Sequence, residues 1–165
     1  MKPILKIAIA FLLFTLMLGF KGVKAGEEYT RTVKKEYAVN PDARVVLNNR
    51  FGKVTCVNWD KNIVAVEVTI TVTASGQPEA DKKFNRISID MKGTASEVSA
   101  ATSMEEMKNS GRGRFSIDYQ VSMPVTVTLD VTNKFGDIFI NELKGRGTID
   151  LGYGNDTLMF DGSGT

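Results

Sequence analysis

The phrase NRFGKV at residues 49–54 returns as NKFGDI at residues 133–138, and this repetition governs how the rest of the chain is interpreted. In each copy an aromatic residue stands directly before a glycine, between two runs of alternating apolar and polar residues. Glycine lets the backbone bend at such a place, so that one strand can turn a corner and continue as a second strand. The match extends to apolar residues on both sides, which align as Val45 with Leu129, Leu47 with Val131, and Cys56 with Ile140.

A third and poorer copy has Tyr153 and Gly154 in place of Phe and Gly. In this copy Asp156 falls where Ile138 stands in the second, so we expect one inserted residue. A period of about 18–20 residues with an aromatic beside a glycine predicts an all-β fold of the β-solenoid or β-roll type, in which short strands stack coil on coil. The alternative is an antiparallel β-sandwich in which Phe-Gly recurs at hairpin bulges.

Alternation of apolar and polar residues continues after Gly26 and predicts strands along most of the remaining chain. The clearest strand is at residues 63–73, where valine and isoleucine alternate with glutamate and threonine, because β-branched residues favour a pleated surface. The other expected elements are strands at 43–48, 87–91, 97–102 and 115–123, a short helix at 79–84, a turn at 40–42 and a long exposed loop at 103–114.

The order of these segments resembles a family of exported bacterial proteins, the putative adhesins. The resemblance rests on the strand that ends in NRFG, the Thr/Val strand, the PEA segment before ISID, IDYQVSMP at residues 117–124, and NKFGDI with its Tyr-Gly copy. It covers roughly residues 27–162 and implies a β-solenoid-like fold at the cell envelope with no established activity. Members of the family are usually longer. Since the pattern stops at residues 162–165 without an evident capping coil, the sequence leaves open whether the domain is truncated at its C-terminus.

Residues 1–25 have the pattern of a secretory signal peptide. Lys2 and Lys6 supply a positive start, residues 7–20 supply an apolar segment, and Ala25 is the small residue expected at a cleavage site. Glycines and lysines interrupt the apolar run before it reaches the roughly 20 residues of a membrane span, which disfavours the alternative of an uncleaved anchor. We therefore expect a signal peptide at 1–25, contact with the membrane only during export, and a β-repeat domain at 26–165.

The charge of the chain changes when this leader is removed. The leader holds four of the 21 basic residues and no acidic residue, so 17 basic residues remain against 19 acidic ones, a net charge of −2. The basic character of the whole chain therefore comes from the leader, and we expect no nucleic-acid partner.

The composition also excludes several kinds of catalytic and metal site. The chain has no histidine, which excludes Ser-His-Asp and Cys-His catalysis and imidazole metal sites. Its single cysteine excludes an intramolecular disulfide and a thiolate zinc cluster. Cys56 aligns with Ile140, so we interpret it as a small buried hydrophobic residue, with a reactive or intermolecular thiol as the alternative.

GYGNDTL at residues 152–158 matches most of a calcium-binding nonapeptide of the β-roll type. Leu151 replaces the first glycine of that motif, and the next window at 160–163 does not repeat it. Such calcium sites form between successive nonapeptides, so we interpret the segment as a bend of the backbone and predict no metal ion and no cofactor.

The remaining polar and aromatic candidates are also interpreted structurally. We expect Asp118 and Asp130 on a solvated strand face, and no spacing in the sequence ties an arginine or a lysine to either, so we predict no catalytic residue. The glycine-rich basic segments at 111–114 and 144–147 are expected to be flexible solvated turns. Trp59 and Tyr119 could stack on sugar rings, but Trp59 aligns with Leu143 and is expected to cover the core.

These patterns predict a non-enzymatic exported protein of the cell envelope, an adhesin or a surface scaffold, whose partner is a protein or a glycan at the cell surface. It would lie in the periplasm, on the outer-membrane surface or outside the cell. One alternative is a periplasmic sensing or regulatory module. A calcium-dependent enzyme acting on polysaccharides is a third hypothesis, since fold alone does not imply activity. The sequence identifies no ligand-binding residue.

Overall fold

The computed structural model describes residues 26–105 and 114–158. The expected signal peptide at 1–25, most of the loop at 103–114, including the basic segment at 111–113, and the window at 160–163 lie outside the described residues. The elements follow in the order β1 (Glu27–Ala38), β2 (Arg44–Phe51), β3 (Val54–Asn58), β4 (Ile63–Ala74), α2 (Gln77–Phe84), β5 (Ile87–Gly93), β6 (Glu97–Met104), β7 (Phe115–Met123), β8 (Thr128–Phe135), β9 (Ile138–Ile140), β10 (Gly147–Tyr153) and β11 (Asp156–Leu158).

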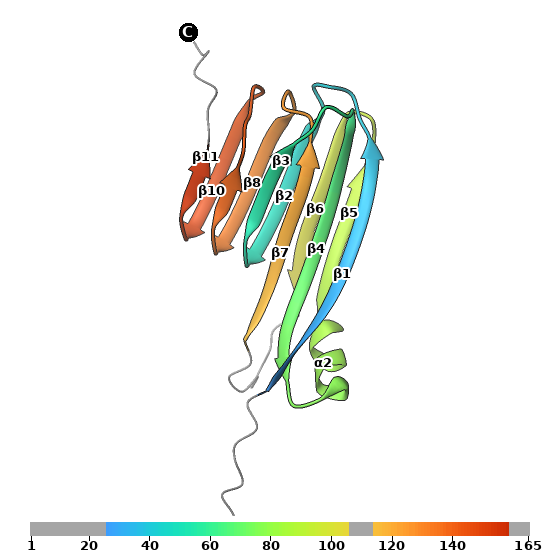
Figure 1. The fold of residues 1–165 in the computed structure, drawn as a ribbon, viewed down its shortest axis with the longest axis vertical. Coiled ribbons are helices and arrows are strands. Elements are labelled where there is room, and N and C mark those ends of the chain that lie inside the picture. Colours follow the sequence, from blue (N-terminus) through green and yellow to red (C-terminus); the bar gives the residue numbers. More distant parts are fainter. Residues whose placement is uncertain (1–25, 106–113, 159–165) are drawn as a thin grey trace, which may run out of the picture.

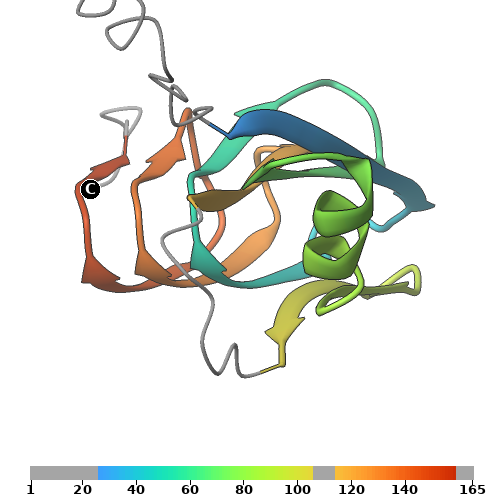
Figure 2. The same ribbon diagram turned by 90° about the horizontal axis from the view of Figure 1, so that it is seen from below.

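The strands form two sheets that face each other across one core, so the prediction of an all-β fold is confirmed (Figure 1). One sheet has six strands in the order β1-β4-β7-β3-β9-β11, and the other has five in the order β10-β8-β2-β6-β5. Figure 2 shows the sheets as two layers, with β10 and β11 at one end and α2 at the other. The short helix expected at 79–84 is α2, which packs on β4 and β1 and buries Ala80 and Phe84.

The three copies of the repeated phrase lie side by side on parallel strands. β2, β8 and β10 pair in register, so that Phe51, Phe135 and Tyr153 are neighbours, and β3, β9 and β11 pair in the same way. The expected one-residue insertion in the third copy is wrong, because Asp156 pairs directly with Ile138. Asp156 is exposed at the edge of the sheet, so a carboxylate at this normally apolar position needs no change of register.

The pairing elsewhere is antiparallel. β1 pairs with β4, β4 with β7, and β5 with β6 in antiparallel fashion. Both sheets are therefore mixed, and the described chain is neither a uniform stack of parallel coils nor an antiparallel sandwich throughout. The antiparallel part contains the two longest strands, β1 and β4, and its long registers align the polar residues of neighbouring strands.

The core fills with the apolar residues that alternate along the strands. β4 confirms the strand expected at 63–73, and its residues Val64, Val66, Val68 and Ile70 are at most 2% exposed. The predicted burial of Cys56 is confirmed, and burial raises the pKa of its thiol to about 12. In the part of the chain that the structure describes, no helix has the length and apolar character needed to cross a bilayer.

Three glycines at matching positions make the bends between the paired strands. Gly52, Gly136 and Gly154 have φ angles of 114°, 122° and 153°, a region that residues with a Cβ rarely adopt. Backbone hydrogen bonds join each bend to the next, with Gly52 N–H donating to Phe135 O at 3.0 Å and Gly136 N–H donating to Tyr153 O at 2.9 Å. The bends therefore stack on one another at a fixed spacing.

Two asparagines fasten these bends from inside. Asn49 and Asn133 are the polar residues buried among those described, at 1% and 0% exposure. The Asn49 Nδ2 donates to Ile117 O at 2.8 Å, and the Asn133 Nδ2 donates to Gly52 O at 2.8 Å. Each amide thus donates a hydrogen bond to a carbonyl oxygen of a neighbouring strand or bend. A buried carbonyl without a partner would lower the stability of the fold.

Candidate functional site

The outward side of the six-stranded sheet carries the candidate functional surface. Along β4, glutamate and threonine alternate with buried valine and isoleucine, and β7 shows the same alternation with serine, aspartate and glutamine. We call this surface the polar face; its central members are Glu67, Thr69, Thr71 and Thr73 on β4 and Ser116, Asp118 and Gln120 on β7. The antiparallel register of β4 and β7 sets these side chains opposite one another.

A row of polar residues crosses the polar face through all six strands or the bends that lead into them. Thr32 on β1 lies opposite Thr69, with 3.3 Å between their hydroxyl oxygens, and Thr69 lies opposite Asp118. Beyond Asp118 the row continues through the bends, where Lys53 N–H donates to the Asp118 Oδ1 at 2.8 Å and Asn155 N–H donates to the Asp137 Oδ1 at 3.0 Å. The row therefore consists of threonine and aspartate side chains together with the backbone N–H groups of Lys53 and Asn155.

A polar cavity of about 520 Å³ opens on this row. Its lining residues are Lys53, Thr55, Glu67, Thr69, Asp118, Tyr119 and Gln120. The Asp118 carboxylate is engaged within the fold, because its Oδ1 accepts from Lys53 N–H and its Oδ2 accepts from the Ser116 hydroxyl at 3.0 Å. Its oxygens hold the bend in place, which corrects the expectation of a merely solvated aspartate. The cavity can offer hydrogen bonds to a polar ligand through its lysine, threonine and glutamine groups.

A second hollow, the end cavity, lies further along β4 and β7 and has a volume of about 470 Å³. Its lining residues are Glu28, Phe51, Thr71, Thr73, Arg114, Phe115 and Ser116. The rings of Phe51 and Phe115 meet edge to face, with centroids 4.9 Å apart and planes at 73°. This cavity therefore combines an aromatic wall with hydroxyl, carboxylate and guanidinium groups.

An aromatic row leads away from the end cavity across the three bends. Phe51 stacks on Phe135 with centroids 5.2 Å apart, and Phe135 stacks on Tyr153 at 5.4 Å. Exposure rises along the row to 41% at Phe135 and 73% at Tyr153. The Arg50 guanidinium lies 5.4 Å from the centre of the Phe51 ring. Stacking covers part of the Phe51 and Phe135 rings, and the Tyr153 ring at the end of the row remains exposed.

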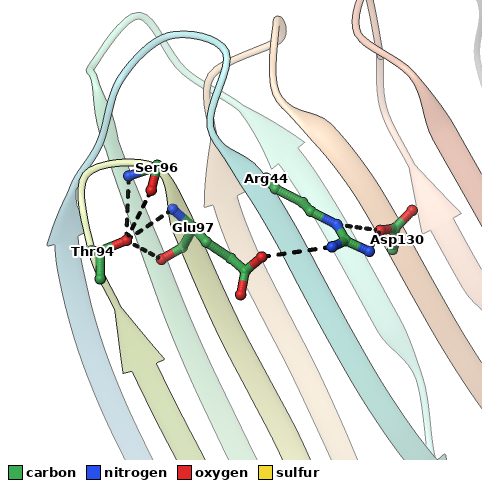
Figure 3. Close-up of polar contacts among 5 residues, drawn as sticks. All are labelled: Arg44, Thr94, Ser96, Glu97 and Asp130. Carbon is green, nitrogen blue, oxygen red and sulfur yellow. Dashed lines mark hydrogen bonds and ion pairs between the residues drawn. The ribbon is translucent and has the colours of Figure 1, made fainter.

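The outward side of the five-stranded sheet carries a charge network that is satisfied within the fold (Figure 3). The Arg44 Nε donates to the Asp130 Oδ2 at 2.7 Å, and an Arg44 Nη lies 3.7 Å from a Glu97 carboxylate oxygen. The hydrogen bond that Arg44 donates to Asp130 raises the pKa of the guanidinium above its ordinary value. This partner of Asp130 could not be read from sequence spacing, because it is the parallel pairing of β2 with β8 that brings Arg44 beside it.

Figure 3 also shows how the turn next to this network is closed. The Thr94 hydroxyl oxygen accepts from Glu97 N–H at 3.1 Å and from Ser96 N–H at 3.3 Å. The polar groups of the turn between β5 and β6 and those of the Arg44 network are therefore engaged in contacts within the fold. For this reason the polar face is the better candidate for contact with a ligand.

The structure buries one of the two aromatic residues that the sequence offered for sugar stacking and leaves the other half-buried. Tyr119 is 1% exposed, its hydroxyl lies 2.8 Å from the Thr102 hydroxyl, and burial raises its pKa to about 12. Trp59 is half-buried, as expected for a covering residue, and its Nε1 donates to Ile63 O at 2.7 Å. Tyr119 therefore presents no free face, and the Lys61 ammonium lies 4.9 Å from the centre of the half-buried Trp59 ring.

The glycine-rich candidates are also placed. Gly154 makes the bend expected for the GYGNDTL segment, and no group of three metal-ligating side chains occurs within residues 26–105 and 114–158. The segment at 144–147 is not a flexible solvated turn, because Lys144 N–H donates to Val125 O at 2.8 Å and Arg146 O accepts from Leu129 N–H at 2.8 Å. A Cβ on Gly145 would run into the Val127 carbonyl, so this turn is packed against the segment that leads into β8.

Phe51 and Phe115 are functional candidates that sequence reasoning missed. In the sequence Phe51 belongs to the repeated phrase and Phe115 to a strand pattern, and neither pattern says that residues from opposite halves of the chain meet at one cavity. The usable signal was the alternation of Thr71, Thr73 and Ser116 with buried residues, which indicated an outward polar side without giving its neighbours.

No family model matches the chain, and no curated protein matches it. Among solved structures, it is similar to a putative cell adhesion protein from Clostridium sporogenes, with 10% identity, a TM-score of 0.43, and coverage of 78% of this chain and 59% of that one. A putative adhesin from Parabacteroides merdae has 10% identity and a TM-score of 0.38, with 78% and 56% covered. A putative lipid binding protein from Parabacteroides distasonis has 12% identity and a TM-score of 0.33, with 82% and 61% covered. The chain spans less than two thirds of each of these structures.

Proposed function

We propose that this protein is a non-enzymatic, exported protein of the bacterial cell envelope that binds a protein or a glycan at the cell surface, in the manner of an adhesin or a surface scaffold. The polar face is the binding surface. Export rests on the pattern of residues 1–25, and the mature protein acts in the periplasm, on the outer-membrane surface or outside the cell.

The observation that carries this proposal is the pair of cavities on the polar face. The polar cavity and the end cavity both lie along β4 and β7, and the Ser116 hydroxyl, which lines the end cavity, donates to Asp118 in the polar cavity. Together they give an extended strip of hydroxyl, amide and charged groups on a rigid sheet. Binding surfaces held on strands keep their geometry better than surfaces on loops.

The proposed fold that presents this strip is a short β-solenoid joined to an antiparallel sheet. Its support is the parallel register of β2, β8 and β10, matched by that of β3, β9 and β11, with the three bends in line. A stack of this kind repeats one bend at a fixed spacing, which suits a protein that presents surface rather than a catalytic pocket.

The non-enzymatic part of the proposal rests on the state of the acidic residues. Asp118 accepts two hydrogen bonds within its own sheet, and Asp130 is paired with Arg44 on the other sheet. A pair of carboxyl groups that cleaves a glycosidic bond has to flank that bond at a separation of about 5–10 Å. Asp118 and Asp130 lie on different sheets with the core between them, and each carboxylate already accepts hydrogen bonds within the fold.

The test uses bacteria that produce the full chain, and measures their adherence to immobilised mucin together with protease shaving against a periplasmic marker. A Thr69→Lys variant puts a long cation on the polar face outside the end cavity, and Thr132→Lys puts one at a half-buried threonine on the other sheet. We expect adherence above that of non-producing cells, a loss in Thr69→Lys, and wild-type adherence in Thr132→Lys. Adherence no greater than that of non-producing cells, or equal effects of the two variants, would overturn the proposal.

A further inference from the structure

We infer that the end cavity is a subsite for one sugar ring of a neutral glycan, and that the glycan chain continues from it into the polar cavity. The inference rests on the proposed function, because it names the ligand class of the same surface. Its grounds are the shape of the end cavity, the chemistry of its walls, its balance of charge and its continuity with the polar cavity.

The size and the aromatic wall suit a sugar ring. A volume of about 470 Å³ lies within the range of small-ligand sites and exceeds what a water molecule or a single ion would fill. Phe51 and Phe115 form one wall, and both are half-buried, so their rings are held in place while part of their surface stays accessible. The C–H side of a pyranose is apolar and packs against such a ring.

The polar groups that line the end cavity suit sugar hydroxyls. Each hydroxyl of a sugar both donates and accepts, and the cavity offers the hydroxyls of Thr71, Thr73 and Ser116, which can do the same. Glu28 supplies acceptors only and Arg114 supplies donors only, so that together they can bind adjacent sugar hydroxyls. Within residues 26–105 and 114–158, neither of these charged side chains takes part in a hydrogen bond or an ion pair.

The charges select against other occupants. One carboxylate and one guanidinium leave the end cavity without net charge, which favours a neutral sugar over a uronic acid that would face Glu28. A purely apolar ligand would cover Glu28 and Arg114 without pairing them, which is unfavourable. The aromatic wall alone would accept an apolar ligand, but the polar wall would not.

Continuity between the cavities predicts a dependence on chain length. Residues two apart on a strand are about 6.6–6.8 Å apart, so the step from Ser116 to Asp118, or from Thr71 to Thr69, is on the scale of one sugar unit. A glycan lying along β4 and β7 would fill both cavities. We therefore expect a hexasaccharide to bind more tightly than a monosaccharide.

The experiment is titration calorimetry of the purified protein with neutral hexasaccharides built of mannose, glucose, xylose or N-acetylglucosamine, with a hexagalacturonate as the acidic comparison. Arg114→Ala and Phe115→Leu alter the end cavity, and Arg146→Ala removes another exposed arginine far from it. We expect at least one neutral hexasaccharide to bind, a loss of affinity of about tenfold or more in Arg114→Ala and in Phe115→Leu, and unchanged affinity in Arg146→Ala.

Three results would overturn the inference: no binding of any neutral hexasaccharide, binding of the hexagalacturonate alone, or affinities that Arg114→Ala and Phe115→Leu leave unchanged. Arg114 is exposed, so its replacement tests the cavity even where Phe115→Leu disturbs folding. Adherence that depends on Thr69 but is not accompanied by saccharide binding would refute the sugar subsite and leave the proposed function standing.

Discussion

The rings of Phe51 and Phe135 lie parallel, with centroids 5.2 Å apart and planes within 7°, although the two residues come from different halves of the chain. Directly after each ring, a glycine with positive φ turns the backbone, and Gly52 N–H donates to Phe135 O. Side-chain stacking and backbone pairing therefore fix the same spacing at the same place. We therefore expect the bends to be sensitive to substitution.

Gly136→Ala should destabilise the protein strongly. Its φ of 122° is strained for any residue with a Cβ, and the new Cβ would run into the Gly52 carbonyl oxygen. We expect a loss of at least about 2 kcal/mol in the free energy of unfolding, measured by chemical denaturation. Gly76→Ala is the control, because the nearest atom to a Cβ there is the Pro78 Cδ at 3.8 Å. Equal effects of the two substitutions would contradict this account of the bend.

The two buried asparagines should differ in their contribution to stability. Asn49 uses both ends of its amide, since its Oδ1 also accepts from the Thr102 hydroxyl at 3.2 Å, whereas the Asn133 Oδ1 is buried without a partner in the described structure. The third copy has Leu151 at the matching position. We expect Asn49→Leu to cost about 3 kcal/mol and Asn133→Leu about half as much. Thermal denaturation of both variants gives the order, and a larger loss in Asn133→Leu would refute it.

Asp156 should keep the edge of the six-stranded sheet from associating. It continues the row of Val54 and Ile138 but carries a charge, and its strand β11 is the outermost in the described part of that sheet. Inward-pointing charges at an edge discourage pairing with another chain. We expect Asp156→Ile to form dimers or larger species at concentrations at which the wild type is monomeric, measured by sedimentation. Asp156→Asn separates polarity from charge, and association of the isoleucine variant no greater than that of wild type would refute the role.

Glu79 should make the docking of α2 depend on acid pH. Its carboxylate accepts hydrogen bonds from the Lys83 ammonium at 2.8 Å and from the Ser75 hydroxyl at 2.6 Å, and these bonds lower its pKa to about 2. Because the folded pKa lies below the usual 4.5, the stabilisation is complete above pH 4.5 and is lost as the pH falls towards 2.

The melting temperatures of the wild type and of Glu79→Gln measure this dependence. We expect the wild type to melt at the higher temperature at pH 6, and the difference to shrink between pH 4.5 and pH 2 as the carboxylate is protonated. The effect is modest because the group is exposed and screened by solvent. A difference that stays constant over this range would contradict the assigned pKa.

Prediction from sequence succeeded for elements whose pattern is local. The valine and threonine alternation at 63–73 is found as β4, and the helix expected at 79–84 is found as α2, which begins at Gln77 and holds Pro78 in its first turn. Both patterns are properties of a short segment. The alignment of Val45 with Leu129 and of Cys56 with Ile140 also matches the pairing of the strands. The candidate site was not predictable in this way, because Phe51, Thr71 and Phe115 meet through the pairing of strands distant in sequence.

The sequence by itself determined that the chain forms strands with one buried side, that Phe-Gly marks the bends, and that Cys56 belongs to the core, because alternation and the freedom of glycine act within a few residues. Only the tertiary structure decided that β4 pairs antiparallel with β7, which sets Thr69 against Asp118, and that β2 pairs in parallel with β8, which brings Arg44 to Asp130. The physical reason is that the register of a sheet depends on the burial of one whole side of it against the rest of the core. That burial involves segments distant in sequence, so no local pattern specifies it.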